Sequence, residues 1–244
     1  MQPNSLIHIV MDSMRFTFNN IKKCSTLAII PVAIGTVLSV LNFYMEHPLT
    51  EVISIILSLI VVIPFTIKWI QLSLGEKVET TYKNSFFWNA KTTQFLLKYI
   101  KISIILMLLM IPIIVLSVKL SSTGLIAIIV LALLTIWVLT LVLRMAMILP
   151  AFVDGKDITI KTALKKTENT NTAILLSGVV FIILIFLFLL MFLIIYMPTI
   201  GSQSLENNFV ILTAGMFLQN AVGILLSATQ TTYLTFMYKK IMEK

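Results

Sequence analysis

The chain has 244 residues, of which 59% are hydrophobic and only 11% are charged, and its mean hydropathy is +1.03. A soluble domain is typically about 45–50% apolar and about 25% charged, so this composition excludes an ordinary soluble protein. The formal net charge of +8 does not indicate nucleic-acid binding, because the lysines and arginines stand in short groups between apolar runs rather than in one patch.

The first 23 residues predict an amphipathic surface helix rather than a cleaved signal peptide. The apolar run that follows them ends without a small-residue cleavage site, so we expect it to stay in the mature chain. Arg15 and Lys22 lie largely opposite an apolar face whose members recur at spacings of three and four. That predicted face consists of Ile7, Val10, Met11, Met14, Phe18 and Ile21.

Six apolar stretches are long enough to cross a bilayer as helices, which need about 20 residues for an apolar core of about 30 Å. Helices are favoured over barrel strands because the apolar residues do not alternate strictly with polar ones. The predicted fold class is all-α: one polytopic membrane domain over residues 1–244, built as a six-helix bundle. Its spans are residues 26–44, 52–72, 95–118, 124–144, 172–197 and 209–235.

Positive charge predicts the orientation of these spans. All but one of the 18 lysines and arginines fall on one side of the predicted membrane, and Lys119 alone lies on the other. Because inner loops carry the excess of positive charge, we expect both termini in the cytoplasm. The opposite loops, residues 45–51, 119–123 and 198–208, are too short for a domain, so a soluble partner would meet the cytoplasmic face.

Two more cytoplasmic stretches predict surface helices before spans 3 and 5. Before span 3, Val78, Tyr82 and Phe86 mark one apolar face. Before span 5, Ile160, Ala163 and Leu164 face away from three lysines. A surface helix followed by a transmembrane hairpin would then occur three times, which indicates a threefold repeat.

Basic residues at the inner boundary are the candidates for contact with anionic lipid, because each nearby Lys or Arg contributes about 1 kcal/mol to such binding. The alternative is that the surface helices only cap the bundle and fix its register. If span 4 continues as a helix to Leu149, Arg144 needs a partner, for which Asp154 or a lipid phosphate would serve. The candidates are Arg15, Lys22, Lys23, Arg144, Lys161, Lys165 and Lys166.

The predicted spans carry no ionisable residue at mid-depth, which argues against proton-coupled transport and against an intramembrane enzyme. His8 and His47 fall on opposite sides of the membrane, and Cys24 is the single cysteine. These residues predict neither an acid–base pair nor a metal site. We therefore expect a protein that is not an enzyme and that uses no cofactor or metal.

Gln219 and Asn220 in span 6 are the intramembrane polar candidates. Their amides predict hydrogen bonds to a neighbouring helix, since small residues such as Gly35 and Ser39 let helices approach closely. A solute site is the less favoured interpretation. It draws some support from Pro31, Pro64 and Pro112, which interrupt three spans and would open carbonyl groups toward a cavity.

Two segments resemble a known family. One runs from Trp69 through Ile70-Gln71-Leu72-Ser73-Leu74-Gly75 to Glu76 and is followed by a Trp88-containing helix. The other runs from Arg144 to Asp154 and is followed by Ala163-Leu164-Lys165-Lys166-Thr167. With six spans, they resemble function-unassigned bacterial inner-membrane proteins that are similar to the membrane domain fused to some glycerophosphodiester phosphodiesterases. The chain departs from that pattern at Gln71, Glu168 and Thr170, and it has no counterpart of the soluble phosphodiesterase barrel.

The leading hypothesis is a non-enzymatic inner-membrane protein that serves as a lipid-contacting scaffold or accessory subunit. The alternative is a transporter or channel for a small hydrophobic or anionic solute. A lipid-headgroup enzyme around Arg144, Asp154 and Asp157 ranks third, because no nucleophile and base are paired in the sequence. The predicted partners are membrane lipids, including anionic ones, with a membrane-protein partner or a second copy of the chain left open and nucleic acid excluded.

Overall fold

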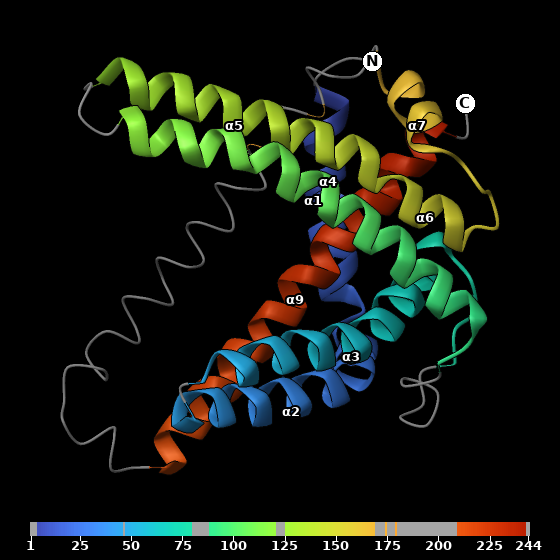
Figure 1. The fold of residues 1–244 in the computed structure, drawn as a ribbon. Helices are drawn as coiled ribbons and strands as arrows, with labels where there is room; N and C mark the ends of the chain where they lie inside the picture. The colour runs from blue at the N-terminus through green and yellow to red at the C-terminus, as the bar shows by residue number, and fades with distance from the viewer. Residues whose placement is uncertain are drawn as a thin grey trace. The chain divides into compact units, whose positions relative to one another are not determined.

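The computed structural model describes residues 4–45, 47–79, 88–120, 125–168, 174, 179 and 209–242. The regular structure of these residues is helical (Figure 1). The helices are α1 (Asn4–Asn19), α2 (Ile21–Met45), α3 (Pro48–Leu74), α4 (Ala90–Leu120), α5 (Leu125–Ala146), α6 (Ile148–Val153), α7 (Ile160–Lys166) and α9 (Phe209–Met242).

Five stretches of the described residues are helical, long and apolar enough to cross a membrane: Ile21–Met45, Pro48–Leu74, Ala90–Val118, Ile129–Val153 and Leu212–Ile241. They contain all or most of the predicted spans 1, 2, 3, 4 and 6. The predicted fifth span, residues 172–197, lies outside the described residues apart from positions 174 and 179. The all-α class and the multi-span membrane class are therefore confirmed.

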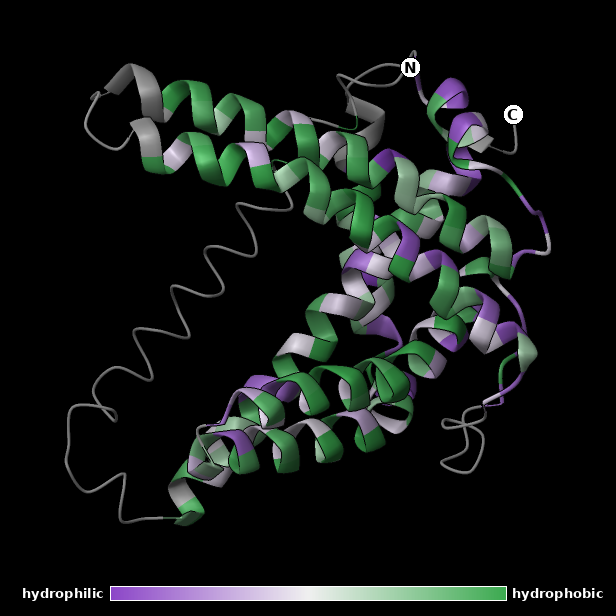
Figure 2. Ribbon diagram, viewed as in Figure 1, coloured by the Kyte–Doolittle hydropathy of each residue, from purple (hydrophilic) through white to green (hydrophobic). Residues whose placement is uncertain are grey.

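The surface of these helices suits lipid rather than water. Hydrophobic residues dominate α2, α3, α4 and α5, whereas hydrophilic residues are frequent on α7 (Figure 2). Along α4, large apolar side chains remain exposed, as at Ile104 (53%), Met107 (68%) and Leu108 (62%). Soluble monomers rarely leave contiguous apolar surface of this kind open to water, so lipid is the natural cover for these side chains.

The chain divides into two compact units. The α2–α3 unit comprises residues 13–92 and 183–232, and the α4–α7 unit comprises residues 1–12, 93–182 and 233–244. In the α2–α3 unit, α2 and α3 pack against each other as a helical hairpin (Figure 1).

Local capping explains where α3 begins and ends. His47 precedes the helix and its Nδ1 accepts a hydrogen bond from the Leu49 N–H at 3.2 Å, while Pro48 takes the first helical position. At the other end Gly75 has φ +93°, and the N–H groups of Gly75 and Glu76 donate to the carbonyls of Leu72 and Gln71. This left-handed C-cap favours glycine, so α3 stops at the glycine of the first family-like segment.

Trp69 forms the centre of the α2–α3 unit. Its side chain is fully buried, and its indole N–H is shared between the Ala228 carbonyl and the Thr232 hydroxyl of α9, each 2.8 Å away. The Phe65 ring stacks on it at 6.2 Å between centroids, and the Phe16 ring meets its edge at 6.0 Å. Trp69 thus joins α1, α3 and α9 through one side chain.

The predicted apolar face of α1 is only partly covered by protein. Val10 is buried, whereas Met11 and Phe18 are 57% and 56% exposed. Ser13 and Thr17 are buried instead. Burial of Thr17 is tolerated because its hydroxyl donates to the Ser13 carbonyl at 2.9 Å. The hydropathy pattern alone cannot distinguish an apolar side chain that faces lipid from one that faces protein.

The predicted second surface helix is corrected in the part that the structure describes. Val78 lies in irregular chain after the Gly75 cap, and Trp88 precedes α4 rather than belonging to a helix. Asn89 sets the start of α4, because its Oδ1 accepts a hydrogen bond from the Thr92 N–H at 2.9 Å. Tyr82 and Phe86 lie outside the described residues.

Candidate functional site

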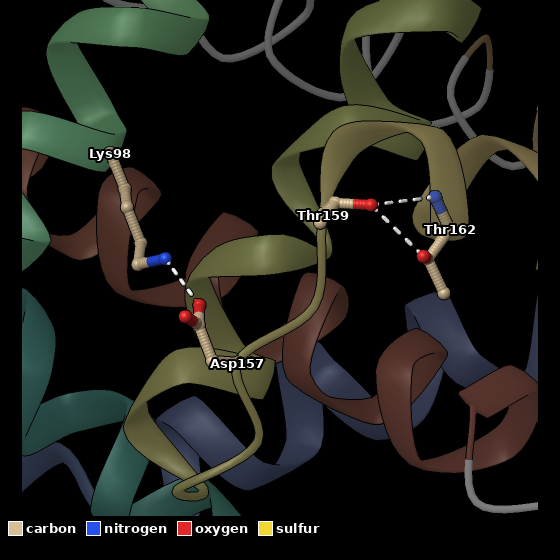
Figure 3. Close-up of polar contacts among 4 residues, drawn as sticks. All are labelled: Lys98, Asp157, Thr159 and Thr162. Carbon is tan, nitrogen blue, oxygen red and sulfur yellow. Dashed lines mark hydrogen bonds and ion pairs between the residues drawn. The ribbon is translucent and has the colours of Figure 1, made fainter.

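The candidate site is the basic region around α7 in the α4–α7 unit. Thr159 caps α7, because its hydroxyl oxygen accepts from the Thr162 N–H at 3.2 Å and lies 2.9 Å from the Thr162 hydroxyl (Figure 3). Ala163 is fully buried, whereas Lys161 and Lys165 are exposed. Of the predicted apolar face of α7, Ala163 is buried, and Ile160 and Leu164 are half-buried.

Arg144 ties the end of α5 to the end of α7. Its Nε donates to the Thr167 hydroxyl at 2.8 Å, and a terminal guanidinium nitrogen donates to the Leu164 carbonyl. Thr167 is fully buried and in turn donates to the Ala163 carbonyl at 2.8 Å. The guanidinium therefore satisfies one carbonyl in the last turn of α7, where the helix dipole favours a positive charge.

Of the two partners considered for Arg144, Asp154 is not the one that the structure shows. The helix α5 ends at Ala146, and Asp154 directly follows the short helix α6. The Asp154 Oδ2 accepts from the Tyr238 hydroxyl at 2.7 Å and lies 3.0 Å from the Lys156 Nζ. Asp154 thus links the end of α6 to the C-terminal turns of α9, whereas Arg144 forms its hydrogen bonds at the end of α7.

The surroundings of Asp154 keep it charged at neutral pH. Burial works to raise the pKa of this carboxyl, but hydrogen bonds from Tyr238 and Lys156, with the charges of Lys156 and Lys239, lower it below the ordinary value. The hydrogen bond to Asp154, followed by the one to Tyr238, raises the pKa of Lys156. A carboxylate held in this way is suited to joining helices and is a poor proton donor for catalysis.

A second ion pair lies beside α7. Lys98 of α4 donates to the Asp157 Oδ1 at 2.6 Å, and its Nζ lies 5.0 Å from the centre of the Phe152 ring (Figure 3). The Lys98 side chain is 26% exposed and the Asp157 side chain is 81% exposed. The sequence did not single out Lys98, because only the fold brings it next to a residue 59 positions away.

The remaining basic candidates belong to the α2–α3 unit. Arg15 is exposed on α1, and Lys22 and Lys23 are exposed in the first turn of α2. Arg15, Lys22 and Lys23 thus belong to the α2–α3 unit. The other four candidates belong to the α4–α7 unit: Arg144, Lys161, Lys165 and Lys166. The exposure of Arg15, Lys22 and Lys23 agrees with a position at a membrane boundary.

Of the two intramembrane amides, Asn220 packs against α2. Its Nδ2 donates to the Met216 carbonyl at 2.8 Å and to the Ser39 hydroxyl at 3.3 Å. A Cβ placed on Gly35 would lie 2.8 Å from the Asn220 Oδ1, so a larger residue at this position would require the amide to shift. Gln219 is exposed on α9. Close approach through a small residue and an interhelical hydrogen bond is the expected packing role of such an amide.

Two cavities of about 380 and 560 Å³ adjoin Asn220 within the α2–α3 unit. Gly35, Ser58 and Val62 border both of them. The larger one is also lined by Asn42 and Ser54, whose side chains share a hydrogen bond of 2.9 Å. The sequence did not single out Ser54 and Ser58, because serines are common in membrane helices. Only the fold shows that both line the same cavity.

No family model, curated protein or solved structure matches the chain. The fold and the apolar helices therefore define its class, an integral membrane protein with several helical spans. Within the described residues, no group of three or more His, Cys, Asp or Glu side chains is placed to hold a metal ion.

Proposed function

We propose that the chain is a non-enzymatic protein of the bacterial inner membrane that binds anionic lipid at its cytoplasmic face, as a scaffold or accessory subunit. The observation that carries the proposal is the two-sided surface of α7. Ala163 is fully buried, and Lys161, Lys165 and Lys166 are exposed on the other side of the helix. A basic helix in this position would meet the negative inner leaflet directly.

The proposal adopts the six-span plan with both termini in the cytoplasm. Five described helices supply five of the spans, and the sequence predicts the sixth at residues 172–197. In this arrangement the likeness to the function-unassigned membrane family remains part of the proposal. It is supported by the basic helix α7 and by the glycine cap at the end of α3, which lie in the two segments that carry the likeness.

The network of Arg144 supports a role for α7 as a rigid platform. A helix of seven residues is unstable alone, since isolated helices shorter than about 12–15 residues are marginal in water. The guanidinium bonds to Leu164 and Thr167 and the Thr159 cap hold its two ends. The three lysines are therefore presented on a fixed surface rather than on a loose loop.

The test is the lipid that accompanies the protein. We expect protein extracted from membranes in mild detergent to carry more anionic phospholipid, relative to zwitterionic phospholipid, than the bulk membrane does. We expect the enrichment to fall at least about fivefold when Lys161, Lys165 and Lys166 are changed together to glutamine. One lysine near the membrane surface contributes about 1 kcal/mol, which corresponds to about a fivefold change in lipid affinity. Lipid mass spectrometry measures the ratio, and Lys91→Gln, in the α2–α3 unit, is the control. An unchanged ratio in the triple variant would refute lipid binding by α7.

A second candidate function is passage of a small solute, and the cavities beside Asn220 favour it. Their polar lining of Ser54, Ser58 and Asn220 lies within otherwise apolar helices, where such groups often mark a solute path. We expect Asn220→Leu to replace the polar lining with an apolar side chain and to lower any solute permeability of proteoliposomes, measured by their swelling in glycerol and in small organic anions. Wild-type proteoliposomes no more permeable than empty liposomes would remove this candidate.

A further inference from the structure

A small cleft in the α4–α7 unit combines cations with apolar side chains. It has a volume of about 210 Å³ and lies between α4, α6 and the start of α7. Its polar lining includes Lys98, Lys101 and Asp157, and its apolar lining consists of Ile102, Ile148, Ile158 and Ile160. Ligand pockets for whole small molecules usually measure about 300–1,000 Å³, so this cleft suits a single chemical group rather than a complete metabolite.

The charge of the cleft favours an anion. Asp157 is matched by Lys98 at 2.6 Å, and Lys101 lies three residues further along α4, on the same helix face. No ion pair of Lys101 is found among the described residues, so the cleft carries one positive charge in excess. The Asp157 side chain is 81% exposed, so an incoming anion can displace it from Lys98 without disturbing buried structure.

The apolar side of the cleft favours a lipid over a free anion. Lys101 belongs to a predominantly apolar membrane helix, and a lysine there extends its stem along apolar surface so that its ammonium reaches the headgroup level. The isoleucines adjoin the same space. A phospholipid provides both matching parts, because its phosphate is anionic and the glycerol and first acyl carbons next to it are increasingly apolar.

We propose that this cleft binds the phosphate headgroup of an anionic phospholipid, with Lys101 as its direct cation and Lys98 shared between the phosphate and Asp157. The inference rests on the proposed lipid-binding function and assigns it one specific site. It differs from the contact of α7 in kind: the outer lysines attract many exchanging lipids, whereas the cleft retains one lipid in a defined position.

The experiment is native mass spectrometry of the full chain in neutral detergent, titrated with phosphatidylglycerol or with phosphatidylcholine. We expect one phosphatidylglycerol to bind well below the concentration at which further lipids add. Lys101→Gln is expected to weaken this first binding about fivefold, and Lys101→Arg to restore most of it. Asp157→Asn is expected to strengthen it, because Lys98 loses its competing carboxylate. Lys91→Gln, in the α2–α3 unit, is the matched control and should leave the first binding unchanged.

Three outcomes would overturn the inference. Equal weakening by Lys101→Gln and Lys91→Gln would mean diffuse attraction and no defined site. Equal first binding of phosphatidylcholine would mean that the headgroup charge is not recognised. Displacement of the first lipid by glycerol 3-phosphate at similar concentration would identify a soluble phosphate as the ligand. The first outcome leaves the proposed function standing, since the enrichment lost in the α7 triple variant is measured separately, and melting temperatures of all variants show whether they are folded.

Discussion

Replacing Trp69 with alanine is expected to lower the free energy of unfolding by about 3–5 kcal/mol, the range for removing a large aromatic side chain from a packed core. The side chain is fully buried, contacts the rings of Phe16 and Phe65, and donates to Ala228 and Thr232 of α9. Its loss therefore leaves a cavity and removes the shared hydrogen bond in one step. We expect the melting temperature in mild detergent, followed by circular dichroism, to fall by roughly 10 °C.

Two further variants separate the ring from its N–H group. Trp69→Phe keeps most of the packing and loses only the shared hydrogen bond, so the expected loss is about 1–2 kcal/mol. Trp137→Ala removes a tryptophan that is 56% exposed on α5, and its effect is expected to stay below about 1 kcal/mol. If Trp69→Ala melted like Trp137→Ala, the central position of Trp69 would be disproved.

The membrane spans were predictable because one strong physical requirement defines them. A bilayer demands about 20 consecutive apolar residues, and α2, α3, α4, α5 and α9 all satisfy that length within a few residues of the predicted bounds. The exact ends depend on local caps, which are weaker signals. Gly75 fixes the end of α3 and Asn89 fixes the start of α4 through local hydrogen bonds, and neither cap was predicted from the sequence.

The facing of the helices was less predictable. For α7, the three lysines favour water, so the sequence predicts that Ala163 faces the protein. Ala163 is buried and the lysines are exposed. For α1, both faces carry apolar residues, and lipid accepts Met11 and Phe18 as readily as protein does. The hydroxyl of Thr17 was able to turn inward because a local backbone carbonyl satisfies it. Hydropathy measures preference for water, and it does not separate the two apolar environments.

The site residues were found by type but not by partner. Arg144 stands out in the sequence because an arginine at the end of an apolar span needs an acceptor. Asp154 was a natural candidate because it is the nearest acid in the chain. The observed acceptors are the Leu164 carbonyl, 20 residues away, and the Thr167 hydroxyl, 23 residues away. Such a pairing depends on how α7 folds back against α5, and it leaves no periodic signal in the sequence.

Removing the Arg144 side chain is expected to release the end of α7. In Arg144→Ala, the Leu164 carbonyl and the Thr167 hydroxyl lose their charged donor, at a cost of about 1.5–3 kcal/mol for such hydrogen bonds. We expect the backbone amides of residues 163–167 to exchange with deuterium roughly tenfold to a hundredfold faster. Hydrogen–deuterium exchange mass spectrometry of the detergent-solubilised protein measures this rate directly.

The shape of the guanidinium is part of this prediction. Arg144→Lys keeps the charge but offers a compact ammonium, which replaces the two-pronged contact poorly, so exchange is expected to lie between the wild type and Arg144→Ala. Thr167→Val removes one of the two acceptors, and combining it with Arg144→Ala should add less than the sum of the single effects, because both act on one network. Full additivity, or unchanged exchange of α7 in Arg144→Ala, would show that another contact holds the basic helix in place.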